Sequence, residues 1–263
     1  MNKLILTVSS LATLALVTPS AHAALIVYEG FDYPQQTGLA TQSGGTGWAT
    51  TWDSISWRTN SSSFGEISTG LTYSTLPTVG QAARNENDFN QSFRTFAPQA
   101  ASGSYWISFL VQKDNLSANS FGISLFDGGS EKNFMGNANS DKFNVAGEGA
   151  NISSTTVTTT VSLFVAKYNM TAGLAHFWID PSLAGEPSAA TAFNGAGGTG
   201  FTAFGFDRIR LGKFNNGSGY LDEIRIGTTA ADVGLVPEPS SLLLLGASGL
   251  LAFKRRRHVR ALG

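Results

Sequence analysis

Apolar and polar residues alternate repeatedly over residues 24–229, and this pattern limits the fold of the chain more than any other feature. In the segment 103–113, for example, apolar residues occupy every second position from Tyr105 to Val111. Successive side chains of a β-strand point to opposite faces, so a period of two predicts strands that bury one face. No part of this region keeps the longer period of an amphipathic helix.

Runs of the same kind predict further strands at 25–29, 121–125, 157–165, 174–180, 208–211 and 220–226. The dipeptides Asp127-Gly128 and Asn216-Gly217 are typical of two-residue hairpin turns. The second is expected to join the strand that carries Ile209 and Leu211 to the last strand. Many short strands over about 206 residues predict an all-β fold, a two-sheet antiparallel jelly-roll sandwich.

Composition excludes several classes of function. The chain has no cysteine, which rules out a disulfide framework, a thiolate zinc site and a cysteine nucleophile. Lys3 lies in the N-terminal segment, and Glu238 and the five basic residues of 254–260 lie in the C-terminal tail, so the middle of the chain carries 11 basic and 17 acidic side chains, a net charge of −6. A nucleic-acid partner would require a basic face, and this region is mildly acidic.

The N-terminus has the features of a secretory signal peptide. Lys3 supplies a positive start, residues 4–17 form an apolar run, and Ala21-His22-Ala23 is a cleavage site with small residues at Ala21 and Ala23. These features predict a signal peptide over 1–23 and therefore an exported protein. A retained anchor helix is the alternative, although the apolar run is short for a full span.

Three features follow one another at the C-terminus: Pro237-Glu238-Pro239, an uncharged apolar segment at 242–253, and a basic cluster at 254–260. As a helix, the apolar segment would cover about 18 Å of a hydrocarbon layer of about 30 Å. The cations behind it favour a short transmembrane helix, with Lys254 and the following arginines on the cytoplasmic side.

This arrangement resembles the PEP-CTERM sorting signal of Gram-negative bacteria, and the resemblance covers residues 236–263. It implies that an exosortase-type membrane transpeptidase recognises the tail and cuts near Pro-Glu-Pro, often in a setting of exopolysaccharide and biofilm production. The protein is then expected to be anchored transiently in the inner membrane by its tail and afterwards to reach the cell surface or the medium. A generic C-terminal anchor is the alternative. The implied sorting and processing residues are Pro237, Glu238, Pro239, Arg255, Arg256 and Arg257.

The body resembles the LamG-like, concanavalin-type jelly rolls of exported bacterial proteins. The resemblance rests on Tyr-Glu-Gly-Phe-Asp-Tyr at 28–33, on Tyr-Leu-Asp-Glu-Ile-Arg-Ile-Gly at 220–227, and on the segment 164–181. It implies one domain over 24–229, followed by a linker and the sorting tail at 230–263. Lectins, glycosidases and adhesion modules all occur in that superfamily, so the resemblance leaves the ligand open.

Residues suited to catalysis are few. His176 is the one histidine between the terminal segments, and its position in a strand favours a packed side chain over a member of a catalytic triad. The segment 86–91 is similar to the Glu-x-Asp-x-x-Glu motif of concanavalin-like glycosidases, but Gln91 stands where the second carboxylate should be. An amide cannot serve as the general acid or base, so no catalytic residue is predicted.

Two binding sites are possible from the residue types. Asp222 shares a predicted strand face with Ile224, and together with Glu29 or Asp32 it would offer the oxygen ligands that Ca²⁺ prefers. The alternative is that Asp222 accepts backbone N–H groups at the start of a strand. No other cofactor is expected.

The second candidate is a group of tryptophans. Trp48, Trp52 and Trp57 lie close together in a Gly/Ser/Thr-rich stretch, and exposed indole faces could stack on sugar rings. The alternative is that they cover a sheet end and seal the core. The leading expectation is a non-catalytic surface or matrix protein with a structural or adhesive role. A lectin-like module that binds polysaccharide is the second hypothesis, and a glycan hydrolase with other carboxylates is the third.

Overall fold

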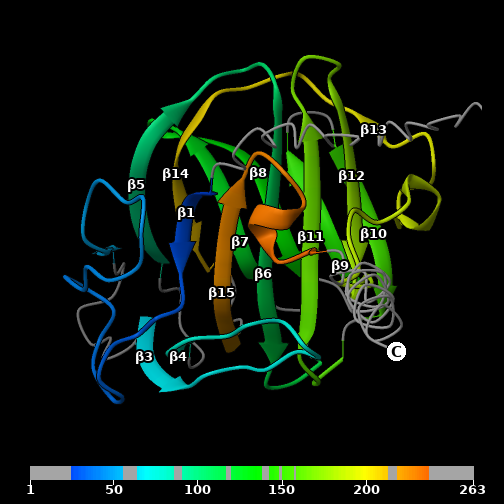
Figure 1. The fold of residues 1–263 in the computed structure, drawn as a ribbon. Helices are drawn as coiled ribbons and strands as arrows, with labels where there is room; N and C mark the ends of the chain where they lie inside the picture. The colour runs from blue at the N-terminus through cyan, green and yellow to red at the C-terminus, as the bar shows by residue number, and fades with distance from the viewer. Residues whose placement is uncertain are drawn as a thin grey trace, which may run out of the picture.

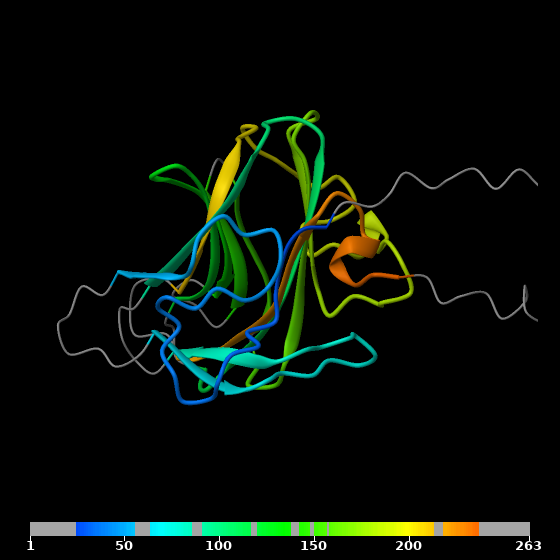
Figure 2. The same ribbon diagram turned by 60° about the vertical axis from the view of Figure 1, so that its left-hand side comes forward.

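The computed structural model describes residues 25–55, 64–85, 91–116, 120–137, 142–147, 150–156, 158–212 and 218–236. These residues form two antiparallel sheets that pack face to face, as Figure 1 and Figure 2 show. The helical elements of this described part are two short 3₁₀ turns, η1 (Ala189–Thr191) and η2 (Ala231–Val233). The predicted all-β sandwich is confirmed, whereas the signal peptide at 1–23 and the apolar segment at 242–253 lie outside the described residues.

The spatial order of the strands in each sheet differs from their order along the chain. Sheet I contains β13 (Thr199–Gly200), β12 (Leu174–Ile179), β11 (Ser162–Asn169), β6 (Ser104–Lys113), β15 (Gly219–Gly227), β4 (Gln81–Asn85) and β3 (Phe64–Thr69), with β1 (Leu25–Glu29) beside β15. Sheet II contains β10 (Ala150–Thr156), β9 (Lys142–Gly147), β8 (Ser130–Asn137), β7 (Phe121–Asp127), β14 (Phe206–Leu211), β5 (Gln91–Gln99) and β2 (Asp53–Ile55).

The first and last strands are neighbours. In β1 and β15, Leu25 lies opposite Gly227 and Glu29 lies opposite Ile224. The beginning of β15 pairs instead with β4, where Gly219 lies opposite Asn85. The long strand β15 therefore pairs with both the first strand, β1, and the β3–β4 hairpin in sheet I.

The main core fills the space between the sheets. The alternating residues predicted to face inward in β6 do so, from Tyr105 to Val111, and so do Ile209 and Leu211 of β14. Burial of each large apolar side chain contributes about 1.5–3 kcal/mol, so these facing rows are a principal source of stability. The period of two was therefore a sound guide for β6 and β14.

The predicted hairpin at Asn216-Gly217 is wrong. β14 lies in sheet II between β5 and β7, and β15 lies in sheet I between β6 and the pair β1 and β4. The connection between β14 and β15 therefore crosses from one sheet to the other. An Asn-Gly dipeptide signals a reversal of the chain, but it does not determine which sheet receives the next strand.

A second apolar cluster covers the outer face of sheet I. It includes Leu163 and Val165 of β11, and Trp106 of β6, whose ring stacks on Trp178 with centroids 5.8 Å apart. Figure 1 shows η2 and the β3–β4 connection in front of this face. The bounds of the predicted strand at 157–165 are wrong, because β11 runs from Ser162 to Asn169. Both of its faces are apolar, with Leu163 and Val165 in the outer cluster and Phe164 in the main core.

The folded body also extends beyond residue 229. Val233 and Leu235 are 0% exposed in the second cluster, so the predicted linker does not begin at 230. Val236, which follows buried Leu235, is 55% exposed. Within the described ranges, no helix has both the length and the apolar character needed to cross a bilayer.

Candidate functional site

Glu29, the last residue of β1, points into the sandwich and is 0% exposed. Its carboxylate accepts hydrogen bonds from Phe31 N at 2.9 Å, Tyr33 Oη at 2.9 Å and Trp52 Nε1 at 3.0 Å. It also forms an ion pair with Arg94 of β5. Three neutral donors and one cation satisfy this buried carboxylate, so its charge is compensated by the fold itself.

Arg94 joins the two sheets through the core. Its side chain is 2% exposed, and its Nε donates to the carbonyl oxygen of Thr50 at 2.8 Å. The guanidinium carbon lies 4.7 Å from the ring centre of Trp48. Arg94 is not among the residues predicted from the sequence, although the alternation in β5 places it on the same face as buried Phe96. An arginine at an inward-facing position requires a buried acidic partner, so the place of Arg94 in the alternation was the sequence signal for a buried ion pair.

The described tryptophans of the predicted sugar platform are packing residues. Trp52 is 1% exposed and offers no ring face to a ligand. Trp48 is half-buried, donates to Tyr28 O at 3.0 Å, and lies 5.6 Å from Trp52 between ring centres. These two residues seal the core, which was the alternative interpretation. Trp57 lies outside the described residues.

A β-bulge in β15 changes the side on which Asp222 lies. Glu223 has a φ of 52°, and the register with β6 shifts between Asp222 and Arg225. As a result Leu221 and Ile224 both face the main core, and Asp222 faces the outer cluster. The predicted common face with Ile224 is wrong, because an extra residue breaks the period of two.

The three predicted calcium ligands do not come together. Glu29 faces the interior, Asp222 faces the outside of sheet I, and Asp32 is exposed. Across the described part of the chain, no group of three or more His, Cys, Asp or Glu residues could hold a metal ion. Ca²⁺ would therefore need ligands other than this set.

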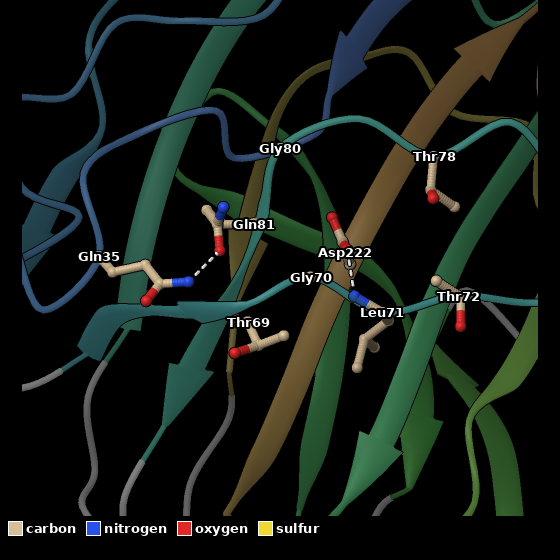
Figure 3. A pocket seen from close by; sticks show the side chains of 9 residues that line it. All are labelled: Gln35, Thr69, Gly70, Leu71, Thr72, Thr78, Gly80, Gln81 and Asp222. Carbon is tan, nitrogen blue, oxygen red and sulfur yellow. Dashed lines mark hydrogen bonds between the residues drawn. The ribbon is translucent and has the colours of Figure 1, made fainter.

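Asp222 lies in a hollow on the outer face of sheet I, between the two arms of the β3–β4 connection (Figure 3). The hollow has a volume of about 260 Å³. Its lining is formed by Gln35, Thr69, Gly70, Leu71, Thr72, Thr78, Gly80, Gln81 and Asp222. Hydroxyl and amide groups therefore surround one buried carboxyl group.

The surroundings of Asp222 raise the pKa of its carboxyl group. It accepts hydrogen bonds from Leu71 N at 2.8 Å and from its neighbour Glu223 N at 2.7 Å. Burial nevertheless raises the pKa of Asp222 to about 8, and the nearby charge of Glu223 acts in the same direction. Near neutral pH a large share of this group is protonated, so it can donate as well as accept a hydrogen bond.

Glu223 holds the β3–β4 connection against β15. It forms an ion pair with Arg225 and accepts hydrogen bonds from Val79 N at 2.6 Å and Tyr28 Oη at 3.1 Å. Arg225 in turn donates to Pro77 O at 2.6 Å. Burial raises the pKa of Glu223, whereas the charge of Arg225 lowers it. These contacts fix the wall of the hollow.

His176 is packed, as the sequence favoured. Its ring stacks on Trp178 with centroids 5.9 Å apart, and its Nε2 lies 3.2 Å from Ala196 O. The glycosidase-like residues Glu86 and Asp88 lie outside the described part of the chain. The buried carboxylates of Glu29, Asp222 and Glu223 each accept hydrogen bonds from groups of the fold.

Comparison with known proteins identifies the tail. Residues 235–257 match the PEP-CTERM protein-sorting motif. The match includes Pro237, Glu238, Pro239 and the arginines Arg255, Arg256 and Arg257, which lie outside the described residues. The motif indicates an exported protein that an exosortase sorts and that is processed at its C-terminal tail. No curated protein matches the chain.

Several solved structures are similar to this chain at 13% identity or less. Domain 4 of AbnA, a GH43 extracellular arabinanase from Geobacillus stearothermophilus, in complex with arabinotriose, gives a TM-score of 0.49 at 13% identity over 82% of this chain and 99% of that one. The cellulose induced protein Cip1 gives 0.46 at 12% identity, over 68% and 91%. Trypanosoma rangeli sialidase gives 0.48 at 9% identity over 82% of this chain, which spans only 32% of the sialidase.

These TM-scores lie below 0.5, so they carry no ligand or activity over to this protein. The arrangement of strands and the match at the tail are established independently of them. The chain combines a two-sheet antiparallel β-sandwich with a PEP-CTERM protein-sorting motif at residues 235–257.

Proposed function

We propose that this protein is a non-catalytic component of the cell surface or extracellular matrix, with a structural or adhesive role in an exopolysaccharide layer. One observation carries the proposal: the sorting motif at 235–257 directly follows a folded sandwich that ends at Leu235. The tail determines delivery, and the sandwich is the part delivered. The protein anchors transiently in the inner membrane by 242–253 before processing.

The contacts of three buried carboxylates, Glu29, Asp222 and Glu223, support a role without catalysis. A glycosidase of the two-carboxylate kind needs one carboxyl group that exchanges a proton with the leaving group and a second on the other side of the scissile bond. Glu29 is 0% exposed and paired with Arg94, so it is not available to a substrate. Asp222 and Glu223 lie next to each other on one strand and bind backbone N–H groups of the same connection.

Substitution of the tail tests delivery. In the full chain, replacement of Pro237, Glu238 and Pro239 with alanines should leave the uncleaved precursor in the membrane fraction, because the processing enzyme loses its recognition site. Immunoblotting of membrane and medium fractions measures this. Release equal to that of the natural chain would contradict processing at this motif. Replacement of Lys254, Arg255, Arg256 and Arg257 with serines should weaken retention of the precursor, since the cations hold the tail on the cytoplasmic side.

A second candidate function, binding of a neutral polysaccharide, is favoured by the hollow over Asp222. Thr69, Thr72 and Thr78 offer hydroxyls, and Gln35 and Gln81 offer amides, which can both donate and accept hydrogen bonds to sugar hydroxyls. Gln35 Nε2 already donates to Gln81 Oε1 at 2.6 Å across the rim. This lining replaces the tryptophan platform as the candidate sugar site.

A binding screen tests this second function. The protein recovered after export is titrated with a panel of soluble neutral polysaccharides, and each ligand is tested again with Thr72→Val and Thr78→Val combined. Loss of two hydrogen bonds should weaken binding about 10- to 100-fold. Thr202→Val, at an exposed threonine outside the hollow, is the matched control and should leave affinity unchanged. Equal binding by all three proteins would exclude the hollow, and no binding by any of them would leave the adhesive role to protein contacts.

A further inference from the structure

The segment between the last strand and the sorting motif is folded onto the body. We call residues 228–235 the strap. Val233 and Leu235 of the strap are 0% exposed and belong to the apolar cluster on the outer face of sheet I. Figure 2 shows η2, in orange, lying against this face. The motif match begins at 235, so its first residue is still part of the folded body.

Hydrogen bonds hold the strap in one conformation. The Asp232 carboxylate accepts from Thr228 N at 2.9 Å, Thr229 N at 2.8 Å and Thr229 Oγ1 at 3.0 Å. Ser108 Oγ of β6 donates to Val233 O at 2.9 Å in a buried contact. The strap is therefore fixed both internally and to the sheet beneath it.

The strap ends in a turn that Gly234 and Leu235 complete. Gly234 has a φ of 89°, which favours glycine, and a Cβ there would lie 2.4 Å from Leu76 Cδ1. Leu235 N then donates to Ala230 O at 3.1 Å and closes the turn. The chain cannot extend away from sheet I until it has passed Leu235.

This arrangement leaves little room for a processing enzyme. An extended chain advances about 3.3–3.6 Å per residue, so Pro237 lies at most about 7 Å beyond Leu235. A peptidase that binds an extended segment around Pro-Glu-Pro would need the residues before it, and Leu235, two residues before Pro237, is buried against the body. Proteolysis of a protected segment follows the population of its locally opened form when opening is fast.

We propose that the strap is a gate for processing: Val233 and Leu235 must leave the outer face of sheet I before the sorting enzyme can act on the tail. This inference rests on the proposed processing at Pro-Glu-Pro. The gate makes the rate proportional to the open fraction, so the rate reports the stability of the strap contacts. Substitutions in the strap outside the motif should then change processing without changing the recognised residues.

The experiment combines a strap variant with a spacer. Conversion of the precursor to the processed form is followed by pulse-chase in cells that contain the sorting enzyme, with the full chain. Val233→Ala removes two buried methyl groups and should raise the conversion rate about tenfold. A spacer of six Gly and Ser residues between Val236 and Pro237 should also raise the rate, because the motif then clears the body with the strap closed. In the chain with the spacer, Val233→Ala should have no further effect.

The combination separates the possible outcomes. Leu116→Ala, at an apolar residue that is 54% exposed, is the matched control and should leave the rate unchanged. A Val233→Ala effect that persists at full size with the spacer would show a general loss of stability and overturn the gate. An unchanged rate in both Val233→Ala and the spacer chain would also overturn it, because the enzyme would then act with the strap closed. Normal conversion of the chain with Pro237, Glu238 and Pro239 replaced by alanines would instead overturn the proposed processing site.

Discussion

Glu29 and Asp222 lie on the adjacent strands β1 and β15, yet their carboxyl groups are stabilised in opposite ways. The inward Glu29 has a cation, Arg94, and donors from two aromatic side chains. The outward Asp222 accepts from two backbone N–H groups, and its pKa is raised to about 8. The first group is therefore tied into the scaffold by an ion pair and hydrogen bonds, whereas the second can change its charge near neutral pH. The interior pair therefore stabilises the fold, and the group that titrates near neutral pH lies on the outer face.

The largest expected effect comes from breaking the inward pair. Glu29→Gln keeps the shape but leaves the Arg94 charge buried without compensation, which should lower the free energy of unfolding by about 3–5 kcal/mol. Urea denaturation of the protein recovered after export measures this. Glu186→Gln, which breaks the exposed pair with Lys167, should cost less than about 1 kcal/mol and is the control. Similar costs for the two variants would mean that the inward pair is not the structural anchor.

The inward site shows what the sequence could and could not predict. Alternation placed β1 and β6 correctly, because each has one face that packs on the main core and burial enforces the period. The same alternation identified Glu29 as a first-strand residue but not its partner, since Arg94 is distant in sequence and the pairing depends on how the two sheets face each other. Trp52 was interpreted as part of a candidate ligand platform because composition does not reveal burial.

The outer site was less predictable for a different reason. A bulge at Glu223 has no clear local signal in a strand of alternating residues, and it moved Asp222 to the other face. The apolar residues of the strap, Val233 and Leu235, were assigned to a linker because they follow the last alternating run. Their role depends on a second apolar cluster on sheet I, which exists only once the strands are paired.

Titration of Asp222 should give the next largest effect. Its folded pKa of about 8 lies above the reference value of 3.8, so between these values the folded state binds more protons than the unfolded state. The contribution to stability is therefore present at low pH and is lost as pH rises from about 4 to about 8. Asp222→Asn should flatten this part of the stability profile, as measured by urea denaturation at several pH values. A slope that persists in the variant would assign the titration to another group.

Lys113 should act in the opposite direction at higher pH. It is 2% exposed in β6, its Nζ donates to Asn137 Oδ1 at 2.8 Å, and burial lowers its pKa from 10.5 to about 8. Between these values the unfolded state binds more protons, so stability should rise as pH increases from about 8 to about 10.5. Lys113→Met should remove this rise while leaving the Asp222 slope below pH 8 in place. Loss of both slopes in one variant would show that the two groups are coupled.

The smallest expected effect is the difference in stability lost when either of two tyrosine hydroxyl groups, one on each side of sheet I, is removed. Tyr33 Oη donates to Glu29 Oε2 at 2.9 Å inside the sandwich, and Tyr28 Oη donates to Glu223 Oε1 at 3.1 Å at the half-exposed outer site. Tyr33→Phe should cost about 1.5–3 kcal/mol, because a hydrogen bond to a buried carboxylate is lost where water cannot replace the donor. Tyr28→Phe should cost only about 0.5–1.5 kcal/mol, because solvent can reach its position. Each variant loses the same single oxygen atom, so unfolding measurements on this pair isolate the environment from the chemistry. Equal costs would mean that the outer site excludes water as well as the core does, and Asp222 would then be as much a part of the scaffold as Glu29.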